Sequence, residues 1–429
     1  LAWFNSFQKK RGIFFRDIVT VMTGTVISRI IALAALPILS RIYTPADFGV
    51  LALFTLVIVT FSCVASGRYD VAIVLPKEDR DATYLLVASI VLITISSLVF
   101  GIVLWVWSGD IADLLGAKEL SFWLLFGPGV IWVLAVSNAV QFWVTRKKQF
   151  GYISASEIGG TTVNVSTQIL LNILFKVGAA GLIIGQIIYQ VMTLIIFSRG
   201  ASRTLKAENL RNFEPRYAFK LLARYKNFPI YDTWANLLNV AAREFPILFL
   251  GIFFSSGIVG LYSMGYRIMS MPVTVIGRAV TRVFLTKAKA GHDAGQLDRM
   301  ALNLCKHLFA LSLTPALMIA VVAPEIIGII LGSAWLESGV YIQWLSVFLA
   351  MTFVAMPLIQ MLFVLEKQRQ RLVYQTVLAA GRITGLVIGG LLGDPVLAVA
   401  LASSIGVVVI FITIIIVMGY AGVKYTLVF

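Results

Sequence analysis

Charged residues are scarce in this sequence. Only 13% of its 429 residues are charged and 59% are hydrophobic, whereas soluble domains average about 25% and about 45–50%. No hydrophilic stretch is long enough to form a separate soluble domain, and the mean hydropathy is +0.92. The composition therefore excludes a soluble protein and indicates one that crosses a membrane many times.

Histidine and cysteine occur only twice each. His292 and His307 lack the spacing of metal ligands, and Cys63 and Cys305 form no CxxC pair. We expect no metal site, no cofactor and no structural disulfide. Both cysteines are expected to be small buried packing residues.

Acidic residues are also few: 20 against 35 basic residues, which leaves a net charge of +15. A nucleic-acid-binding protein would carry such a charge on one face of a folded soluble module. Here the basic residues gather at the ends of hydrophobic segments. We therefore expect no nucleic-acid partner, and we interpret the charge as a signal of membrane orientation.

Long hydrophobic segments are what the sequence has in abundance. A membrane-spanning helix needs about 20 mostly apolar residues. Twelve segments qualify: 17–39, 46–67, 82–107, 120–144, 151–174, 179–198, 229–252, 257–281, 300–322, 340–364, 372–392 and 396–419. They predict an all-α integral membrane protein with twelve transmembrane helices.

The loops between these segments differ in charge. One alternating set of loops holds 26 basic residues, and the other set holds only three, Arg41, Lys118 and Lys176. Lysine and arginine concentrate on the cytoplasmic side of membrane proteins. Both termini are therefore predicted to be cytoplasmic.

A faint internal repeat divides the twelve segments into six and six. "NAVQFWVTRKKQ" (138–149) matches "PLIQMLFVLEKQ" (357–368) at three positions with a constant offset, and each stretch closes a span and leads into a basic loop. Two halves of six spans face the same way, as in transporters built from parallel repeats. We expect an N-terminal lobe (1–198) and a C-terminal lobe (229–429), facing a shared central cavity.

The segment between the two lobes, 199–228, is the most basic loop. Within it, "PRYAFKLLARYKN" places Arg216, Lys220 and Arg224 on one helical stripe. Each basic residue near an anionic membrane surface gains about 1 kcal/mol. We predict an amphipathic helix that lies on membrane lipids; an ordinary solvated linker helix is the alternative.

Six basic residues lie inside the hydrophobic segments, although an arginine at the bilayer centre costs about 3 to 15 kcal/mol. Four arginines are at mid-depth, against one carboxylate, Glu244. Buried polar contacts between helices could account for some of them, but packing alone requires no surplus of positive charge. The surplus predicts a cationic cavity for an anion, and arginine favours phosphate or carboxylate. The six are Arg29, Arg243, Arg267, Arg278, Lys306 and Arg382.

Polar residues recur at helical spacing in three of the segments, so that each set shares one face. The fifth segment carries Glu157, Thr161, Asn164, Gln168 and Asn172. The seventh carries Asp232, Asn236, Asn239 and Arg243, and the eighth carries Ser263, Arg267, Ser270, Thr274 and Arg278. We expect these stripes to line the cavity.

Three stretches resemble a known family. They are "ISRIIALAALPILSRIYTPADFGVLAL" (27–53), "GRYDVAIVLPKEDRDA" (67–82) and "GIVGLYSMGYRIMSMP" (257–272). They are similar to the Wzx-type polysaccharide-export flippases, relatives of the MATE antiporters and lipid II flippases in the MOP exporter superfamily. The resemblance implies a multi-pass protein of the bacterial inner membrane. It would carry an undecaprenyl-pyrophosphate-linked oligosaccharide, such as an O-antigen repeat unit, to the outer leaflet by alternating access.

With that substrate, the polar residues inside the spans can be given roles. The pyrophosphate would be bound by the six basic residues named above. The sugars would contact Asn164, Gln168, Asn236, Asn239, Tyr262 and Tyr266. Carboxylates that could couple transport to an ion are Glu157, Asp232 and Glu244. Polysaccharide polymerase and chain-length machinery are candidate partners, and two internal lobes make a monomer sufficient.

Three other functions compete with this one. A MATE-like multidrug or cation antiporter would need acidic residues at mid-depth, where this chain has a positive surplus. A lipid II flippase shares the cationic cavity but typically has two further spans. A membrane enzyme would carry catalytic residues in a large outer loop, and the outer loops here are short. We therefore predict that the protein is not an enzyme.

Overall fold

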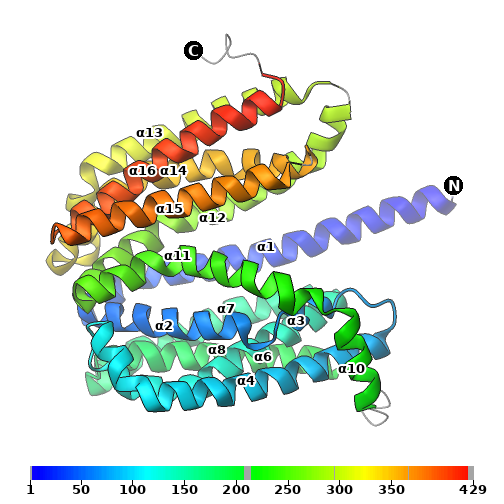
Figure 1. The fold of residues 1–429 in the computed structure, drawn as a ribbon, viewed down its shortest axis with the longest axis horizontal. Helices are drawn as coiled ribbons and strands as arrows, with labels where there is room; N and C mark the ends of the chain where they lie inside the picture. The colour runs from blue at the N-terminus through cyan, green and yellow to red at the C-terminus, as the bar shows by residue number, and fades with distance from the viewer. Residues whose placement is uncertain (1, 207–213, 294, 366, 424–429) are drawn as a thin grey trace. The chain divides into compact units, whose positions relative to one another are not determined.

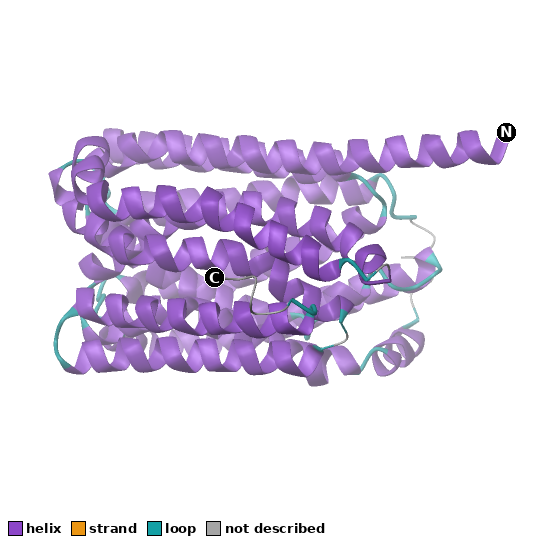
Figure 2. Ribbon diagram, turned by 90° about the horizontal axis from the view of Figure 1, so that it is seen from above, coloured by secondary structure: helices purple, strands orange, loops and turns teal. Residues whose placement is uncertain are grey.

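The computed structural model describes residues 2–206, 214–293, 295–365 and 367–423, and all regular structure in these ranges is helical. Twelve of the helices are long and apolar enough to cross a membrane. Figure 2 shows how completely helices account for the described chain. The predicted all-α membrane fold with twelve spans is confirmed, whereas the orientation of the termini and the central cavity stay predictions.

The chain forms two compact units, Leu1–Glu244 and Phe245–Phe429. The division falls inside helix α11 (Thr233–Phe253). The domain boundaries expected from the sequence, at 198 and 229, stay predictions, and residues 207–213 of the expected linker lie outside the described residues.

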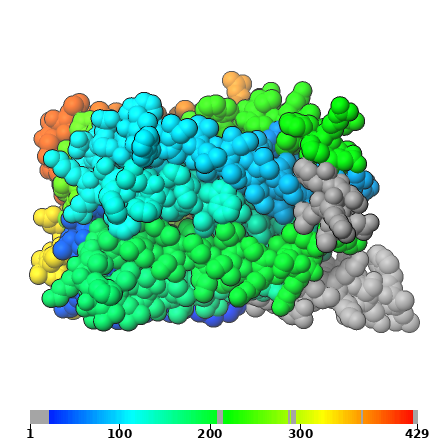
Figure 3. All heavy atoms as spheres, turned by 90° about the horizontal axis from the view of Figure 1, so that it is seen from below, coloured from blue at the N-terminus to red at the C-terminus, as the bar shows by residue number. Residues whose placement is uncertain are grey.

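Unit 1 contains the first six spans (Figure 1). Its helices are α1 (Ala2–Ile42), α2 (Pro45–Ala65), α3 (Tyr69–Ala72), α4 (Asp79–Leu114), α5 (Leu120–Leu124), α6 (Gly127–Arg146), α7 (Phe150–Phe175), α8 (Ala179–Ser202) and α10 (Pro215–Arg224), followed by a π-helical turn, η1 (Phe228–Asp232), and the start of α11. Helix α1 packs along α7, α7 along α8, and α6 lies against α2, α4 and α8. Figure 3 shows the outer surface formed by part of this unit.

Local sequence explains how α2 begins. The Thr44 hydroxyl accepts from the Asp47 backbone N–H, and the Asp47 carboxylate accepts from the Thr44 N–H at 2.8 Å. This capping box satisfies two backbone donors of the first turn, and Pro45 suits the first helical position. Just before it, the Tyr43 hydroxyl donates to the Gln168 carbonyl at 2.7 Å, which fastens the end of α1 to α7.

Unit 2 is built around one central helix. After α11 come α12 (Ser256–Asp293), α13 (Leu297–Leu331), a short 3₁₀ turn η2 (Ser333–Trp335), α14 (Leu336–Val364), α15 (Gln368–Leu391) and α16 (Pro395–Tyr420). Helix α14 packs against α12, α13 and α16, and more than half of its residues are buried.

Helices α15 and α16 approach each other closely along a seam of small residues. A Cβ on Gly385 would come within 2.6 Å of Ala402, and one on Gly389 within 2.2 Å of Ala398. Gly385 and Gly389 are four residues apart, as are Ala398 and Ala402, which is the small-xxx-small pattern of closely packed membrane helices. We call these four residues the glycine–alanine seam.

Several helices depart from their expected limits; the eighth and ninth, for example, run to Asp293 and Leu331, whereas ends at 281 and 322 were expected. The fourth was expected as one helix over 120–144, but the chain breaks between α5 and α6, where Pro128 occupies the first turn of α6. Proline lacks the backbone N–H that a continuous helix needs. The third was expected to end at 107; the helix instead kinks at Trp107 (φ −109°, ψ 16°) and continues to Leu114.

Candidate substrate-binding site

One candidate patch lies in unit 1, where α1, α7 and α8 meet. The Ser28 hydroxyl donates to Glu157 Oε2 at 3.4 Å, and Arg29 is exposed beside it. Both Glu157 and Arg29 act electrostatically on the Tyr189 hydroxyl of α8. The structure therefore brings a predicted anion-binding arginine and a predicted coupling carboxylate into one polar patch.

Farther along α7, the polar stripe connects helices. Asn164 Nδ2 donates to Gln186 Oε1 at 3.5 Å, and Gln168 Nε2 donates to the Leu182 carbonyl at 3.2 Å. Asn172 donates to the Ile42 carbonyl. Gln168 is only 5% exposed. These contacts favour a packing role for Gln168, while Asn164 is half-buried and its Oδ1 has no donor among the described residues.

The polar stripe that leads into and along α11 is largely occupied by neighbours in unit 1. Asp232 accepts from Arg68 Nε at 2.8 Å, and Asn236 Nδ2 donates to the Cys63 carbonyl at 3.4 Å. Asn239 donates to the Ala235 carbonyl of its own helix. Asp232 is therefore already held by a cation.

The four mid-depth arginines are not equivalent. Arg243 Nε donates to Glu244 Oε1 at 2.8 Å, so its charge is compensated by the next residue. Arg267 is exposed on α12, as is Arg278 about three turns farther along, and Lys306 is exposed on α13. Arg243 therefore adds less to the surplus of positive charge than the count of basic residues suggests.

Arg382 on α15 has an unusual environment. Its Cζ lies 4.5 Å from the centroid of the Phe348 ring of α14. Its Nε is buried and has no acceptor among the described residues. A half-buried guanidinium that lies on a ring, with no carboxylate partner among the described residues, keeps its hydrogen-bonding capacity for an anion.

The two predicted sugar-binding tyrosines of α12 lie differently. Tyr262 is 3% exposed and packs edge-on against Tyr341 of α14, with ring centroids 6.1 Å apart. Tyr266 stacks on Tyr262 at 6.0 Å and is half-buried. Tyr262 therefore belongs to the core of unit 2, and Tyr266 keeps an accessible edge.

Unit 2 also holds an apolar pocket of about 230 Å³ between α12, α13 and α14. Pro272 and Pro315 lie on its walls, and Phe353 is among its lining residues. Met269, Pro272, Val273 and Ile276 form its α12 wall, on a different face of that helix from the stripe that contains Arg267. The pocket is thus separate from the cationic stripe.

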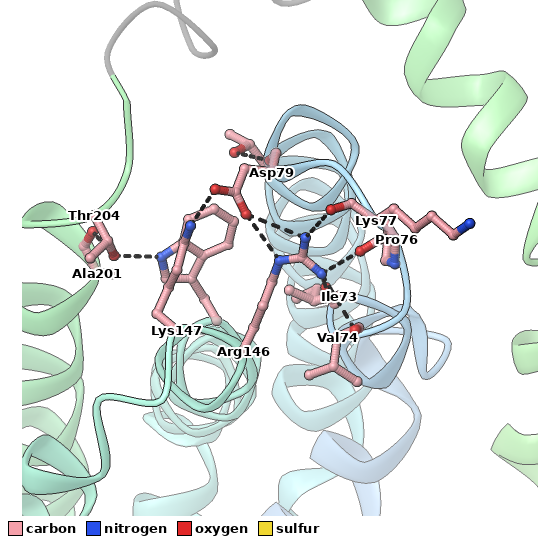
Figure 4. A network of polar contacts seen from close by, with 11 residues as sticks. Ile73, Val74, Pro76, Lys77, Asp79, Arg146, Lys147, Ala201 and Thr204 are labelled. Atoms are coloured by element: carbon pink, nitrogen blue, oxygen red, sulfur yellow. Dashed lines mark hydrogen bonds and ion pairs between the residues drawn. The ribbon is translucent and has the colours of Figure 1, made fainter. Parts of the chain in front are cut away.

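Sequence reasoning missed a polar network at one end of unit 1. Asp79 accepts from Arg146 Nη2 at 3.3 Å and also from Lys147, and Arg146 Nη1 donates to the Pro76 carbonyl at 2.6 Å (Figure 4). Lys147 also lies over the Trp143 ring, and Trp143 Nε1 donates to Thr204 at 3.0 Å. The sequence placed these cations in a loop but gave no sign that one carboxylate gathers two of them.

The start of the linker helix α10 is fixed to α4 in the same unit. Tyr217 donates to Asp81 at 2.8 Å, and Arg80 lies over the Tyr84 and Tyr217 rings. The hydrogen bond to Asp81 is the main cause of a raised pKa at Tyr217. The predicted basic stripe, Arg216, Lys220 and Arg224, is exposed, and so is Phe219.

Among the described residues, no cluster of three or more histidine, cysteine or acidic side chains could hold a metal ion. Cys305 is buried and Cys63 half-buried, and both are free thiols. His307 is exposed, and its Nδ1 contacts the Asn303 carbonyl.

Comparison with known proteins identifies the family. A family model described as "Polysaccharide biosynthesis protein" matches residues 38–340. The chain belongs to this family. The resemblance to the polysaccharide-export proteins is thereby confirmed.

Two curated relatives of this polysaccharide biosynthesis protein are distant. One is the teichuronic acid biosynthesis protein TuaB of Bacillus subtilis (strain 168), 21% identical over 240 residues, 55% of this chain and 48% of the relative. The other is an uncharacterized membrane protein in the cps region of Klebsiella pneumoniae, 22% identical over 332 residues, 75% of this chain and 65% of the relative. The chain thus matches about half of the first relative's length and just under two thirds of the second's.

Solved structures establish the fold class of this family member. A lipid II flippase, MurJ, in an inward closed conformation superposes with a TM-score of 0.72 at 15% identity, covering 92% of this chain and 87% of that one. An inward-facing MATE-family multidrug transporter of the MOP superfamily gives 0.66 at 15% identity, covering 92% and 95%. The chain therefore shares the fold of these two membrane proteins.

Proposed function

We propose that the protein is a flippase that carries a lipid-linked, phosphate-bearing saccharide from one leaflet of the membrane to the other. The observation that carries this proposal is Arg382, which lies inside a span on the Phe348 ring, with no carboxylate partner among the described residues. Membership of the polysaccharide biosynthesis family supports a saccharide cargo. Two of the solved proteins that share the fold are described as a flippase and a transporter.

The finer proposal names an undecaprenyl-pyrophosphate-linked oligosaccharide as cargo, moved outward across the bacterial inner membrane by alternating access. The pyrophosphate would bind to Arg29, Arg267 and Arg382, with Arg278 and Lys306 adding to the positive field. Arg243, already paired with Glu244, would contribute less. Among the sugar-binding candidates, Asn239 is exposed and Tyr266 is half-buried, so these two side chains are the more accessible ones.

The experiment uses a strain that lacks the protein. Its lipid-linked glycans are isolated after exposure of intact cells to an impermeant glycan-modifying probe. The proposal predicts that these glycans accumulate and are protected from the probe. Wild-type protein and Arg299→Ala should restore export, while Arg382→Ala and Arg267→Ala should not, although both variants reach the membrane. Arg299 is a suitable control because it is exposed near the start of α13.

Two results would overturn the proposal. One is full export by both Arg382→Ala and Arg267→Ala. The other is a normal pool of lipid-linked glycan in the deletion strain together with altered sensitivity to drugs or cations, which would assign the protein to antiport. Accumulation of lipid II instead would replace the cargo with the cell-wall precursor.

We propose Glu157 as the ion-coupling carboxylate, ahead of Asp232 and Glu244, which are already paired with Arg68 and Arg243. Carboxylates inside membrane spans often serve proton or sodium coupling. Glu157→Gln should remove the pH dependence of export in inverted vesicles. An unchanged pH profile would exclude this role.

A further inference from the structure

Helix α15 carries two arginines that meet α14 in the same way. The Arg382 guanidinium lies over Phe348, as described, and Arg371 Cζ lies 4.2 Å from the centroid of the Phe363 ring. The Nε of each arginine is buried without an acceptor among the described residues. We call Arg371 and Arg382 the arginine pair of α15.

The arginine pair occupies one face of the helix. Eleven residues separate the two positions, which is about three turns and a rise of about 16 Å. Arg371 lies in the second turn of α15, at the end where the charge asymmetry predicts the cytoplasmic headgroups, and Arg382 lies near mid-span. One side of α15 thus offers two guanidinium groups at two depths.

The supporting rings position these cations but do not neutralise them. In the part of the chain that the structure describes, neither arginine has a carboxylate within ion-pair distance, and α15 itself contains no acidic residue. A cation–π contact is weaker than the cost of holding an arginine among apolar groups. What does compensate a guanidinium well is a phosphate, which can accept two parallel hydrogen bonds.

We propose that Arg371 is the first binding site for the phosphate headgroup of a lipid-linked substrate on the cytoplasmic side, and that Arg382, three turns deeper, is the second. This proposal rests on the proposed flippase function. It adds Arg371, which sequence analysis counted among the cations of the cytoplasmic loops. It also states the order in which the two arginines bind the substrate. The recognised chemistry is a phosphate or pyrophosphate attached to a membrane lipid.

The binding experiment uses the full chain in nanodiscs of zwitterionic lipid, with undecaprenyl pyrophosphate as the probe. Arg371→Gln should weaken binding at least about tenfold, because it removes a charge-assisted, bidentate contact. Arg369→Gln is the matched control. It removes the same charge two residues earlier, from an exposed position on the opposite side of the helix, and should change affinity less than about twofold. Arg371→Lys should fall between the two.

The rates of binding test the order. A charge at the rim of a site mainly affects association, whereas a desolvated one mainly affects dissociation. Arg371→Gln should lower the association rate of the probe, and Arg382→Gln should raise its dissociation rate. If both variants changed only dissociation, Arg371 would not be the first site.

Two controls separate specific binding from simple attraction of anionic lipid. Nanodiscs that contain phosphatidylglycerol should not compete with the probe at equal concentration; full competition would show a general headgroup site and overturn the substrate assignment. Glu366 lies outside the described residues and precedes α15. Glu366→Gln should leave affinity unchanged, and a large gain would show that Arg371 is normally neutralised, which contradicts the proposal.

The outcome also distinguishes this inference from the proposed function. If wild type binds the probe tightly and Arg371→Gln and Arg369→Gln bind it with equal affinity, only the assignment of Arg371 as the first site is rejected. If the wild-type protein does not bind the probe, the flippase proposal is rejected as well. Each variant is first compared with wild type by size-exclusion profile and melting temperature, so that lost binding is not lost folding.

Discussion

The two units treat their cations differently. In unit 1, the cations near the ends of the spans meet carboxylates: Arg68 meets Asp232, Arg80 meets Glu214, and Arg146 and Lys147 share Asp79. In the described part of unit 2, Lys367, Arg371 and Arg382 instead lie on the rings of Tyr420, Phe363 and Phe348. The same residue types therefore do two kinds of work. Arg80 and Lys147 of unit 1 also lie on rings, but each has a carboxylate partner. Arg371 and Arg382 have a ring and no carboxylate partner among the described residues, so they stay able to bind an anion.

The largest contrast is expected between Arg146 and Arg382. The Arg146 side chain is 11% exposed and serves Asp79 and backbone carbonyls of the preceding loop. Its replacement by glutamine leaves partly buried acceptors without their donor, which costs about 1–3 kcal/mol. Arg146→Gln should therefore lower the melting temperature of the protein in detergent. Thermal unfolding followed by tryptophan fluorescence measures this change.

Arg382→Gln provides the opposite half of this comparison. It removes a buried donor that has no acceptor among the described residues, so the melting temperature should stay the same or rise, while export is lost. A large fall in the melting temperature of Arg382→Gln would mean that Arg382 is a structural residue, and the distinction between the two units would fail.

A second effect concerns how unit 2 is held together. A Cβ at Gly389 would come within 2.2 Å of the Ala398 backbone, and backbone cannot move aside as a side chain can. Gly389→Val should destabilise the protein by about 1–3 kcal/mol or more, since overpacking forces the helices apart. Ile388→Val, at the exposed neighbouring position, is the control and should fold normally. Equal melting temperatures for the two variants would show that the glycine–alanine seam is not a tight contact.

The smallest effect is expected at Asp70 in unit 1. This carboxyl is 5% exposed, and burial raises its pKa, although a 2.7 Å hydrogen bond from Ser66 acts in the other direction. Because the folded pKa lies above the unfolded one, the protonated carboxyl stabilises the fold below the ordinary pKa of about 4, and this contribution is lost as pH rises through the folded value. Asp70→Asn should therefore raise the melting temperature slightly at pH 7 and not at pH 3. A fall at pH 7 would mean that the ionised form is the one that the structure needs.

Hydropathy and charge predicted the twelve spans because length and apolarity are strict requirements of the bilayer. All twelve expected segments correspond to spans in the structure. The errors lie at local features: the break before Gly127 depends on where Pro128 falls within a turn, and the kink at Trp107 has no proline to announce it.

The candidate site was predictable only in part. Arg29, Arg267 and Arg382 could be selected from the sequence, because a charged residue is easily recognised inside a hydrophobic segment. Sequence analysis did not select Arg371 as a candidate, because basic residues are common at the ends of spans. What distinguishes Arg371 is its contact with the Phe363 ring of another helix. Pairing across helices, such as Arg68 with Asp232, depends on contacts 164 residues apart in the chain, which a single sequence does not reveal.

The glycine–alanine seam bears on how the protein can move. The backbones of α15 and α16 approach closely at two levels, so a larger side chain at either glycine would force the helices apart. Gly406 of α16 also lies 3.6 Å from the Arg382 side chain, measured from the position a Cβ would take. In mechanical terms, we expect α15 and α16 to act as one rigid body, with Arg382 at a fixed position along it. We therefore expect α15 and α16 to move together in any rearrangement that displaces Arg382.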